Sequence, residues 1–381
     1  MEETISLYIS NITKSINLVI KCKKLITILD LKELVAKELD TYACLFRLTN
    51  GTNLEENLDT LLSDLNINNE DRLYFMNKLN IERAVLEEWF RLDGHNWEYH
   101  ANWCSNLPLS QWYGVTTNEN GKVIEFNLSD NNLCLVPSEL SQLTNLYYLN
   151  LFNNNLISVP SELSQLTNLT SLLLDNNNLT LVPSELSQLT KLYYLNLSNN
   201  NLTSVPFCGI PQNVALGDLS PNVPSELSQL TNLYYLNLSN NNLTLVPSEL
   251  SQLTNLTYLN LYNNNLYTVP SELSQLTNLT SLYLSLNNLT SVPLEFSRLT
   301  NSQYLYLNNN NLTLVPSELS QLTNLTHLDL SNNNLTSVPS ELSQLTNLKY
   351  LYLNNNNLTS VPSELSQLTN LKYLYLNNNN L

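Results

Sequence analysis

The sequence predicts an α/β fold, a repeat solenoid with a parallel sheet on its concave side and short helical turns on its convex side, preceded by a small domain. One pattern recurs every 23 residues from Val123 onward. Each copy joins a short alternating apolar stretch to a segment suited to one helical turn. Because one such unit cannot bury its own apolar face, the copies must stack to form a continuous core.

A clean copy of the repeat is NLTSLLLDNNNLTLVPSELSQLT, residues 168–190. Leu172 and Leu174 alternate along a strand and are predicted to point inward, where each contributes roughly 1.5–3 kcal/mol when buried. Pro183 is predicted to start the helical turn and Ser184 to cap it. Copies of the core LxxLxLxxNxL begin at Val123, Leu146, Leu169, Leu192, Leu233, Leu256, Leu279, Ser302, Leu325, Leu348 and Leu371.

This in-register series resembles the leucine-rich repeat family. In that family the asparagine of the motif turns inward and bonds the backbone of adjacent coils, a role suited to an amide that has both donors and an acceptor. The resemblance implies a structural, non-catalytic role for Asn131, Asn154, Asn177, Asn200, Asn241, Asn264, Asn287, Asn310, Asn333, Asn356 and Asn379. The predicted solenoid covers residues 123–381.

The array has one irregular segment, residues 206–222. Val205 and Val223 each precede a proline, and they are 18 residues apart, where the regular spacing is 23. The sequence between them, FCGIPQNVALGDLSPN, has lost most of the motif. Two interpretations stay open, drift of one repeat or a binding insertion.

Residues 81–122 resemble the N-terminal cap that precedes plant-type repeats. A helix predicted from Glu82 to Leu92 is followed by several tryptophans, which can cover the exposed first coil. The residues that carry the resemblance are Leu86, Trp89, Asp93, Gly94, Trp97, Trp103, Trp112, Gly114 and Val115. Secreted caps have cysteines where this chain has Ser110 and Thr117, so the resemblance implies a protein without that disulfide.

Residues 1–80 resemble ubiquitin-like domains. ISLYISN and INLVIKC alternate as a β-hairpin, and a helical period follows from Leu31 to Leu39, which together predict a small β-grasp domain. The closest match runs from Leu61 to Phe75, but the chain continues without a Gly-Gly end, so we expect no conjugation to other proteins. A docking module and a purely structural domain both remain possible interpretations.

Composition limits the partners and the location. A net charge of −17 argues against nucleic acid and anionic membranes, since phosphate binding needs clustered Lys and Arg. The sequence has no run of about 18 apolar residues, and its start does not have the pattern of a signal peptide. The five cysteines are odd in number and scattered, which favours a reducing, cytoplasmic location.

No motif carries catalytic chemistry. His95, His100 and Cys104 lie close together, but packing in the cap explains them better than a metal site. With six glycines there is no phosphate loop, and no protease, kinase or hydrolase constellation is present. We therefore expect a chain that is not an enzyme and uses no cofactor or metal.

The strand positions between the leucines are the candidate protein-binding residues, because they vary while the rest of the repeat is nearly identical. Tyrosine offers a large amphipathic contact at low entropy cost, although it also suits strands for purely structural reasons. The predicted concave site consists of Tyr148, Phe152, Tyr194, Tyr235, Tyr258, Tyr262, Tyr283, Tyr304, Tyr306, His327, Asp329, Tyr350, Tyr352, Tyr373 and Tyr375.

The sequence thus predicts an intracellular adaptor that holds an unidentified protein partner on this face. The alternative is a substrate-recognition subunit linked to ubiquitin signalling, and a third class is a structural or decoy protein. Because the sequence stops at Leu381 directly after a strand motif, and an unpaired strand edge invites pairing, we also expect end-to-end self-association there.

Overall fold

The computed structural model divides the chain into two compact units, Met1–Leu92 and Asp93–Leu381. The residues that the structure describes are 4–11, 17–23, 30–31, 34–35, 46–49, 72–77, 81–203 and 223–381.

The first unit contains a four-stranded sheet with the order β2-β1-β4-β3. The predicted hairpin is present, because β1 (Thr4–Asn11) pairs antiparallel with β2 (Asn17–Lys23). Strand β4 (Arg72–Asn77) runs parallel to β1 and antiparallel to β3 (Phe46–Thr49). Most of the predicted helix after Leu31, and residues 50–71, lie outside the described residues, so the β-grasp assignment stays a prediction.

Helix α2 (Ile81–Asp93) closes the first unit along the sequence, one residue longer at each end than predicted. The second unit starts at the buried Asp93, whose carboxylate connects the end of helix α2 with the segments that contain Trp97 and Cys134. It accepts hydrogen bonds from the Trp97 indole at 3.2 Å and from the Cys134 backbone amide at 3.0 Å. The tryptophans then pack on one another, with the rings of Trp97 and Trp103 edge-to-face at 4.7 Å.

The second unit is a solenoid with a twelve-stranded sheet that runs in sequence order from β5 to β16. Only the first pair is antiparallel, between β5 (Val115–Thr117) and β6 (Val123–Asn127), and every later pair is parallel. The later strands have three residues each: β7 Tyr148–Asn150, β8 Ser171–Leu173, β9 Tyr194–Asn196, β10 Tyr235–Asn237, β11 Tyr258–Asn260, β12 Ser281–Tyr283, β13 Tyr304–Tyr306, β14 His327–Asp329, β15 Tyr350–Tyr352 and β16 Tyr373–Tyr375.

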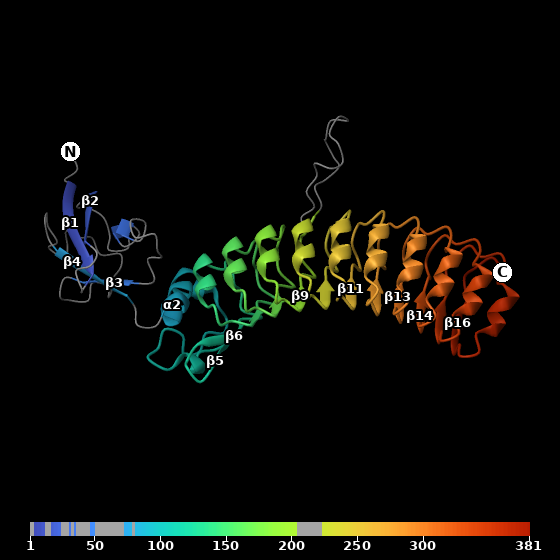
Figure 1. Ribbon diagram of the computed structural model, residues 1–381, viewed down its shortest axis with the longest axis horizontal. Helices are drawn as coiled ribbons and strands as arrows, with labels where there is room; N and C mark the ends of the chain where they lie inside the picture. Colours follow the sequence, from blue (N-terminus) through green and yellow to red (C-terminus); the bar gives the residue numbers. More distant parts are fainter. Residues whose placement is uncertain are drawn as a thin grey trace, which may run out of the picture. The chain divides into compact units, whose positions relative to one another are not determined.

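Short 3-10 turns lie on the outer side of the curved solenoid and the strands on its inner side (Figure 1). After η3 (Gly94–Asn96) and η4 (Leu109–Gln111), one turn occurs per coil: η5 Ser138–Gln142, η6 Ser161–Gln165, η7 Ser184–Gln188, η9 Ser225–Gln229, η10 Ser248–Gln252, η11 Ser271–Gln275, η12 Leu294–Arg298, η13 Ser317–Gln321, η14 Ser340–Gln344 and η15 Ser363–Gln367.

The predicted serine cap of these turns is wrong. In η7 the N-cap is Pro183, and Ser184 is already inside the turn. The Ser184 hydroxyl donates to the side chain of Glu185 at 3.4 Å rather than receiving a backbone amide. The turn closes through its own backbone, because the Leu186 amide donates to the Pro183 carbonyl at 3.2 Å.

The core between strands and turns has the predicted composition. Leu172 and Leu174 are fully buried, and their counterparts in the other interior coils are buried as well. The inward asparagines are confirmed: the Asn177 amide donates to the Leu151 carbonyl of the preceding coil at 2.9 Å, and its oxygen accepts from the Leu156 amide at 3.0 Å. Each such asparagine therefore connects two coils through buried backbone groups.

Strands β9 and β10 pair directly, although the irregular segment lies between them in the sequence. Tyr194 and Tyr235 are 41 residues apart in sequence, 18 more than the period, yet they are paired neighbours in the sheet. The asparagine ladder also crosses the junction, since the Asn241 amide donates to the Leu197 carbonyl at 3.1 Å. The stack thus continues in register across the irregularity, which argues against drift of a whole repeat. Residues 204–222, which include the predicted irregular segment 206–222, lie outside the described residues.

A candidate protein-binding surface on the strands

The strands present three rows of side chains on the inner side of the solenoid, here called the strand face. From β7 to β16 the middle residue of each strand is a leucine of the inward row, which is buried as far as β15, so its two neighbours point away from the core. The first row holds the first strand residues, and the second row holds the third strand residues. The third row holds the residues two positions after the strand, such as Phe152 and Tyr262.

All fifteen predicted residues lie on the strand face. The first row contains Tyr148, Tyr194, Tyr235, Tyr258, Tyr304, His327, Tyr350 and Tyr373. The second row contains Tyr283, Tyr306, Asp329, Tyr352 and Tyr375. Most are half-buried by their neighbours, while Tyr373 at the last coil is 48% exposed.

Ring stacking joins eleven of these residues into three runs. The longest starts in the first row, with Tyr194 and Tyr235 at 4.2 Å, and then joins Tyr258 at 4.3 Å. It changes to the second row through a tilted contact of 5.2 Å to Tyr283, followed by Tyr306 at 5.0 Å. The other runs are Tyr304–His327–Tyr350–Tyr373 and Tyr352–Tyr375.

Four predicted residues are outside these runs: Tyr148, Phe152, Tyr262 and Asp329. Phe152 lies two strands before the tyrosine-rich part, and Tyr262 is 36% exposed in the third row. The structure therefore concentrates the aromatic surface between β9 and β16 rather than along the whole array.

Burial changes the acidity of several groups on the strand face. It raises the pKa of Tyr235, Tyr258 and Tyr306 to about 12 in each case, because the tyrosinate would lose solvation. These hydroxyls remain neutral hydrogen-bonding groups across the physiological range.

Strand β14 interrupts the tyrosine pattern with two titratable residues. Burial, and then the positive charge of Lys349, lower the pKa of His327, which therefore favours the neutral ring. Burial raises the pKa of Asp329, although two hydrogen bonds from Ser331 act in the opposite direction. The same strand thus carries a neutral aromatic ring in the first row and a poorly solvated carboxyl group in the second.

The sequence reasoning missed a groove beside the strand face. It has a volume of about 820 Å³ and runs across the residues that precede the strands, including Lys191, Tyr193, Tyr234, Thr257, Thr280 and Gln303. Its regular wall is formed by asparagines whose amides donate to threonine carbonyls of the preceding coil, such as Asn255 to Thr231 at 2.8 Å. The signal was present in the sequence, because the residue before each strand varies as much as the strand rows do.

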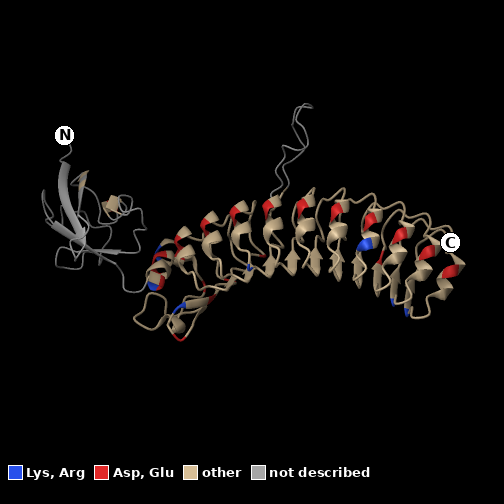
Figure 2. Ribbon diagram, in the orientation of Figure 1, with Lys and Arg blue, Asp and Glu red and all other residues tan. Residues whose placement is uncertain are grey.

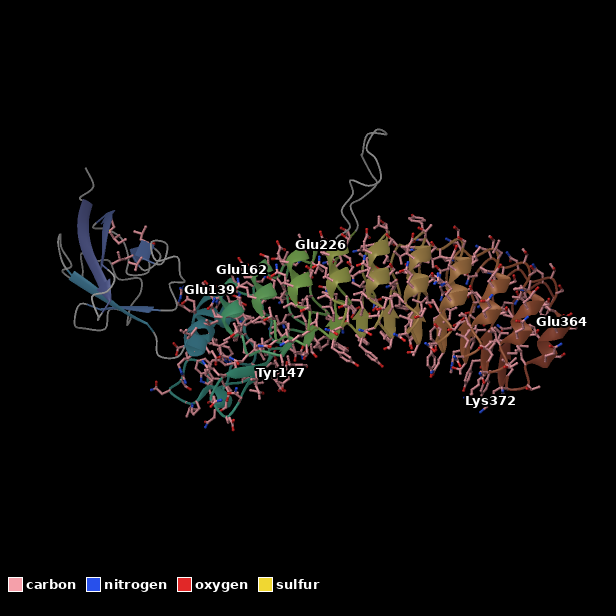
Figure 3. All side chains as sticks on the ribbon, viewed as in Figure 1. Glu139, Tyr147, Glu162, Glu226, Glu364 and Lys372 are labelled. Carbon is pink, nitrogen blue, oxygen red and sulfur yellow. The ribbon has the colours of Figure 1, made fainter. Side chains whose placement is uncertain are left out.

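Charge is distributed unequally over the solenoid. Acidic side chains recur along the outer turns, whereas the strands carry few charges (Figure 2). The outer side chains of Glu139, Glu162, Glu226 and Glu364 lie opposite Tyr147 and Lys372, which come from the strand side (Figure 3). The inner face is therefore mainly aromatic and polar, and the outer face is acidic.

The described residues contain neither a metal-binding cluster nor a membrane-spanning helix. No group of three His, Cys, Asp or Glu side chains there is arranged to hold a metal ion. No helix in that part of the chain is long and apolar enough to cross a membrane.

The chain belongs to the leucine-rich repeat family. Family models described as leucine rich repeat match residues 254–312, 277–335 and 323–381, and others match 168–189, 191–213 and 232–253. Proteins of this family commonly act as non-enzymatic scaffolds for protein interactions. The comparison with curated proteins gives no match.

Three solved structures share the solenoid. A TDR receptor is 32% identical with a TM-score of 0.61, over 68% of this chain and 44% of that chain. The Arabidopsis receptor kinase HAESA, in complex with the peptide hormone IDA and the co-receptor SERK1, is 28% identical with a TM-score of 0.58. That match covers 79% of this chain and 54% of HAESA. The PEPR1–AtPEP1 complex is 25% identical with a TM-score of 0.56, over 77% of this chain and 48% of that chain. The chain spans about half the length of these receptors.

Proposed function

We propose that this chain is a non-enzymatic adaptor that binds a protein partner on the strand face, between β9 and β16. The observation that carries the proposal is the aromatic surface there, which combines three runs of stacked rings with neutral hydroxyl groups. Such side chains bury a large area while keeping a hydrogen bond available, and they dominate binding energy at protein interfaces. The structures of HAESA in complex with IDA and of PEPR1 with AtPEP1 support this use of the fold.

The test compares the two sides of the solenoid in the full chain. Peptides and protein fragments selected from a displayed library against the wild-type chain supply the ligands. The double variant Tyr306→Ala with Tyr352→Ala should weaken their binding at least tenfold, since truncated hot spots typically cost more than about 2 kcal/mol. Both residues are half-buried, so a small loss of stability should accompany the loss of binding.

The matched control changes Glu318 and Glu341 to alanine on the outer turns η13 and η14 of the same region. These glutamates recur in nearly every coil and should leave binding unchanged. If the glutamate changes abolish binding and the tyrosine changes do not, the strand face is the wrong surface.

The alternative function is substrate recognition linked to ubiquitin signalling, which depends on the predicted ubiquitin-like domain at residues 1–80. The parallel pairing of β1 with β4 beside an antiparallel hairpin supports such a domain. Capture of ubiquitin-pathway proteins by the whole chain, but not by residues 82–381, would favour this function over a simple adaptor. Residues 1–80 attached covalently to a lysine of another protein would refute the prediction that they are never conjugated.

A cytoplasmic location is part of the proposal. Its support is the scattered cysteines together with Ser110 and Thr117 at the places where secreted caps carry a disulfide. The melting temperature should stay the same when reductant is added, and a large drop would contradict this location. Self-association through the last coil stays a prediction.

A further inference from the structure

The second row of the strand face contains a carboxylate between two tyrosines. Asp329 on β14 is the register partner of Tyr306 on β13 and of Tyr352 on β15. Because neighbouring strands are about 4.8 Å apart, the two tyrosines are separated by roughly 10 Å, with the carboxylate between them. The electrostatic influence of Asp329 on both tyrosine hydroxyls is consistent with this proximity.

The charge of Asp329 is not required by the local structure. Five other coils have asparagine at the same position: Asn127, Asn150, Asn196, Asn237 and Asn260. Asn196 accepts hydrogen bonds from the Ser198 amide at 3.2 Å and from its hydroxyl at 2.9 Å.

Asp329 accepts the same two hydrogen bonds, from the Ser331 amide at 2.9 Å and from the Ser331 hydroxyl at 2.7 Å. Both bonds reach the same oxygen, Oδ1, and so hold the carboxylate in one orientation. An amide would satisfy these donors equally well without the cost of desolvating a charge.

The carboxylate also has no ion-pair partner among the described residues. Two basic residues come from the same part of the face: His327, which favours the neutral form, and Lys349, which precedes strand β15. A half-buried carboxylate that the fold does not need and does not neutralise is suited to an incoming cation.

We propose that Asp329, Tyr306 and Tyr352 form a recognition pocket for a cationic side chain, arginine or lysine, of a peptide that lies along the strand face. A cation between the two rings would be within about 6 Å of both aromatic faces, the range of cation–π attraction. Its N–H groups would donate to the free oxygen of the oriented carboxylate in a charge-assisted hydrogen bond. The net charge of −17 on the whole chain would favour the approach of a basic partner.

This inference rests on the proposed binding function, so the experiment must separate the two. Random peptides displayed in a library are selected against the immobilised full chain, and an enriched peptide is synthesised with its cationic residue and with glutamine in its place. The wild-type chain should prefer the cationic peptide at least tenfold. Asp329→Asn should reduce that preference to less than twofold while leaving the affinity for the glutamine peptide unchanged.

The walls of the pocket are tested with the same pair of peptides. Tyr352→Leu should lower the preference several-fold, whereas Tyr352→Phe, which retains the ring, should keep it. Glu341→Gln lies on the outer turn η14, in the same coil as Asp329, and removes one negative charge as Asp329→Asn does. It should leave the preference for the cationic peptide unchanged. Peptides with arginine, lysine and trimethyl-lysine at the cationic position show which cation the pocket favours.

The possible failures have different meanings. Enriched peptides without a cationic residue, or a cationic preference that survives Asp329→Asn, would overturn the pocket but leave the binding function intact. If no peptide binds, or if substitution of both Tyr306 and Tyr352 leaves the affinity unchanged, the proposed function is refuted, and the pocket is refuted with it. A large fall in melting temperature for Asp329→Asn would show that the carboxylate is structural, which also refutes the pocket.

Discussion

The outer turns and the strand face belong to the same coils but differ sharply in how uniform they are. Nine of the ten turns from η5 to η15 read SELSQ, and only η12 departs from it. In the same coils the second row of the strand face contains asparagine, leucine, tyrosine and aspartate. Since the backbone register is identical in every coil, packing accounts for the constant buried Leu and Ser of these turns and leaves the strand face free to vary, whereas it does not explain the constant Glu and Gln, which are exposed in turns such as η7. In the proposed function, these variable positions are the ones that contact the partner.

The largest expected effect comes from breaking a constant position, with Asn264→Ala. The Asn264 amide donates to the Leu238 and Leu261 carbonyls at 3.0 and 3.2 Å, and its oxygen accepts from the Leu243 amide at 3.1 Å. Each buried group left unpaired costs about 1–3 kcal/mol, so the free energy of unfolding should fall by about 3 kcal/mol or more. Urea unfolding followed by circular dichroism measures the change.

The adjacent Asn265 is the matched control. Its side chain is exposed, and it contributes a backbone amide to the Leu243 carbonyl that alanine would retain. Asn265→Ala should therefore change the free energy of unfolding by less than about 0.5 kcal/mol. Equal effects of the two substitutions would mean that the inward asparagines do not connect the coils energetically.

A smaller effect is expected at alkaline pH. There the free energy of unfolding should depend on the buried tyrosines of the strand face, whereas the apolar core does not titrate. The pKa of Tyr235, Tyr258 and Tyr306 is about 12 in the folded chain, against about 10 for an unfolded tyrosine. Between these values the unfolded chain releases protons that the folded chain retains, so the contribution of these three tyrosines to stability should be complete below about pH 10 and be lost from pH 10 to 12.

Thermal unfolding as a function of pH tests this decline, and the ultraviolet absorbance of tyrosinate follows the titration directly. Changing Tyr235, Tyr258 and Tyr306 to phenylalanine should flatten the decline, because phenylalanine keeps the ring and removes the proton. Tyr267→Phe, at a residue that is 61% exposed, should leave the decline as it is. An unchanged decline in the triple variant would contradict the burial of these hydroxyls.

The repeat period made much of the solenoid predictable from sequence. The inward leucines and the placement of the strand residues follow from a spacing that returns every 23 residues, whereas the asparagine ladder was implied by the resemblance to the leucine-rich repeat family. Ring stacking did not follow, because the change of row at Tyr258 and Tyr283 depends on the geometry of neighbouring strands. The direct pairing of β9 with β10 was also hidden, since sequence alone could not distinguish a drifted coil from extra residues within one coil.

The smallest expected effect tests a single coil that departs from a constant loop position. Leu286 has a φ of +54°, and the equivalent residues in other coils are asparagines such as Asn263 and Asn309, with φ of +51° and +55°. A left-handed backbone costs a side chain such as leucine about 1–2 kcal/mol, whereas asparagine tolerates it. Leu286 is 38% exposed, so its replacement would lose little buried area.

Leu286→Asn should therefore raise the free energy of unfolding by about 1 kcal/mol. The new amide can also bond its neighbour, as Asn263 does when it donates to the Asn240 oxygen at 2.8 Å. Leu286→Ala is the control, because alanine removes the side chain but keeps the unfavourable backbone, and it should bring no gain. If Leu286→Asn stabilises the chain but weakens the selected peptides, the strained leucine belongs to the variable binding face. If it destabilises the chain, the leucine is held by packing and belongs with the constant positions.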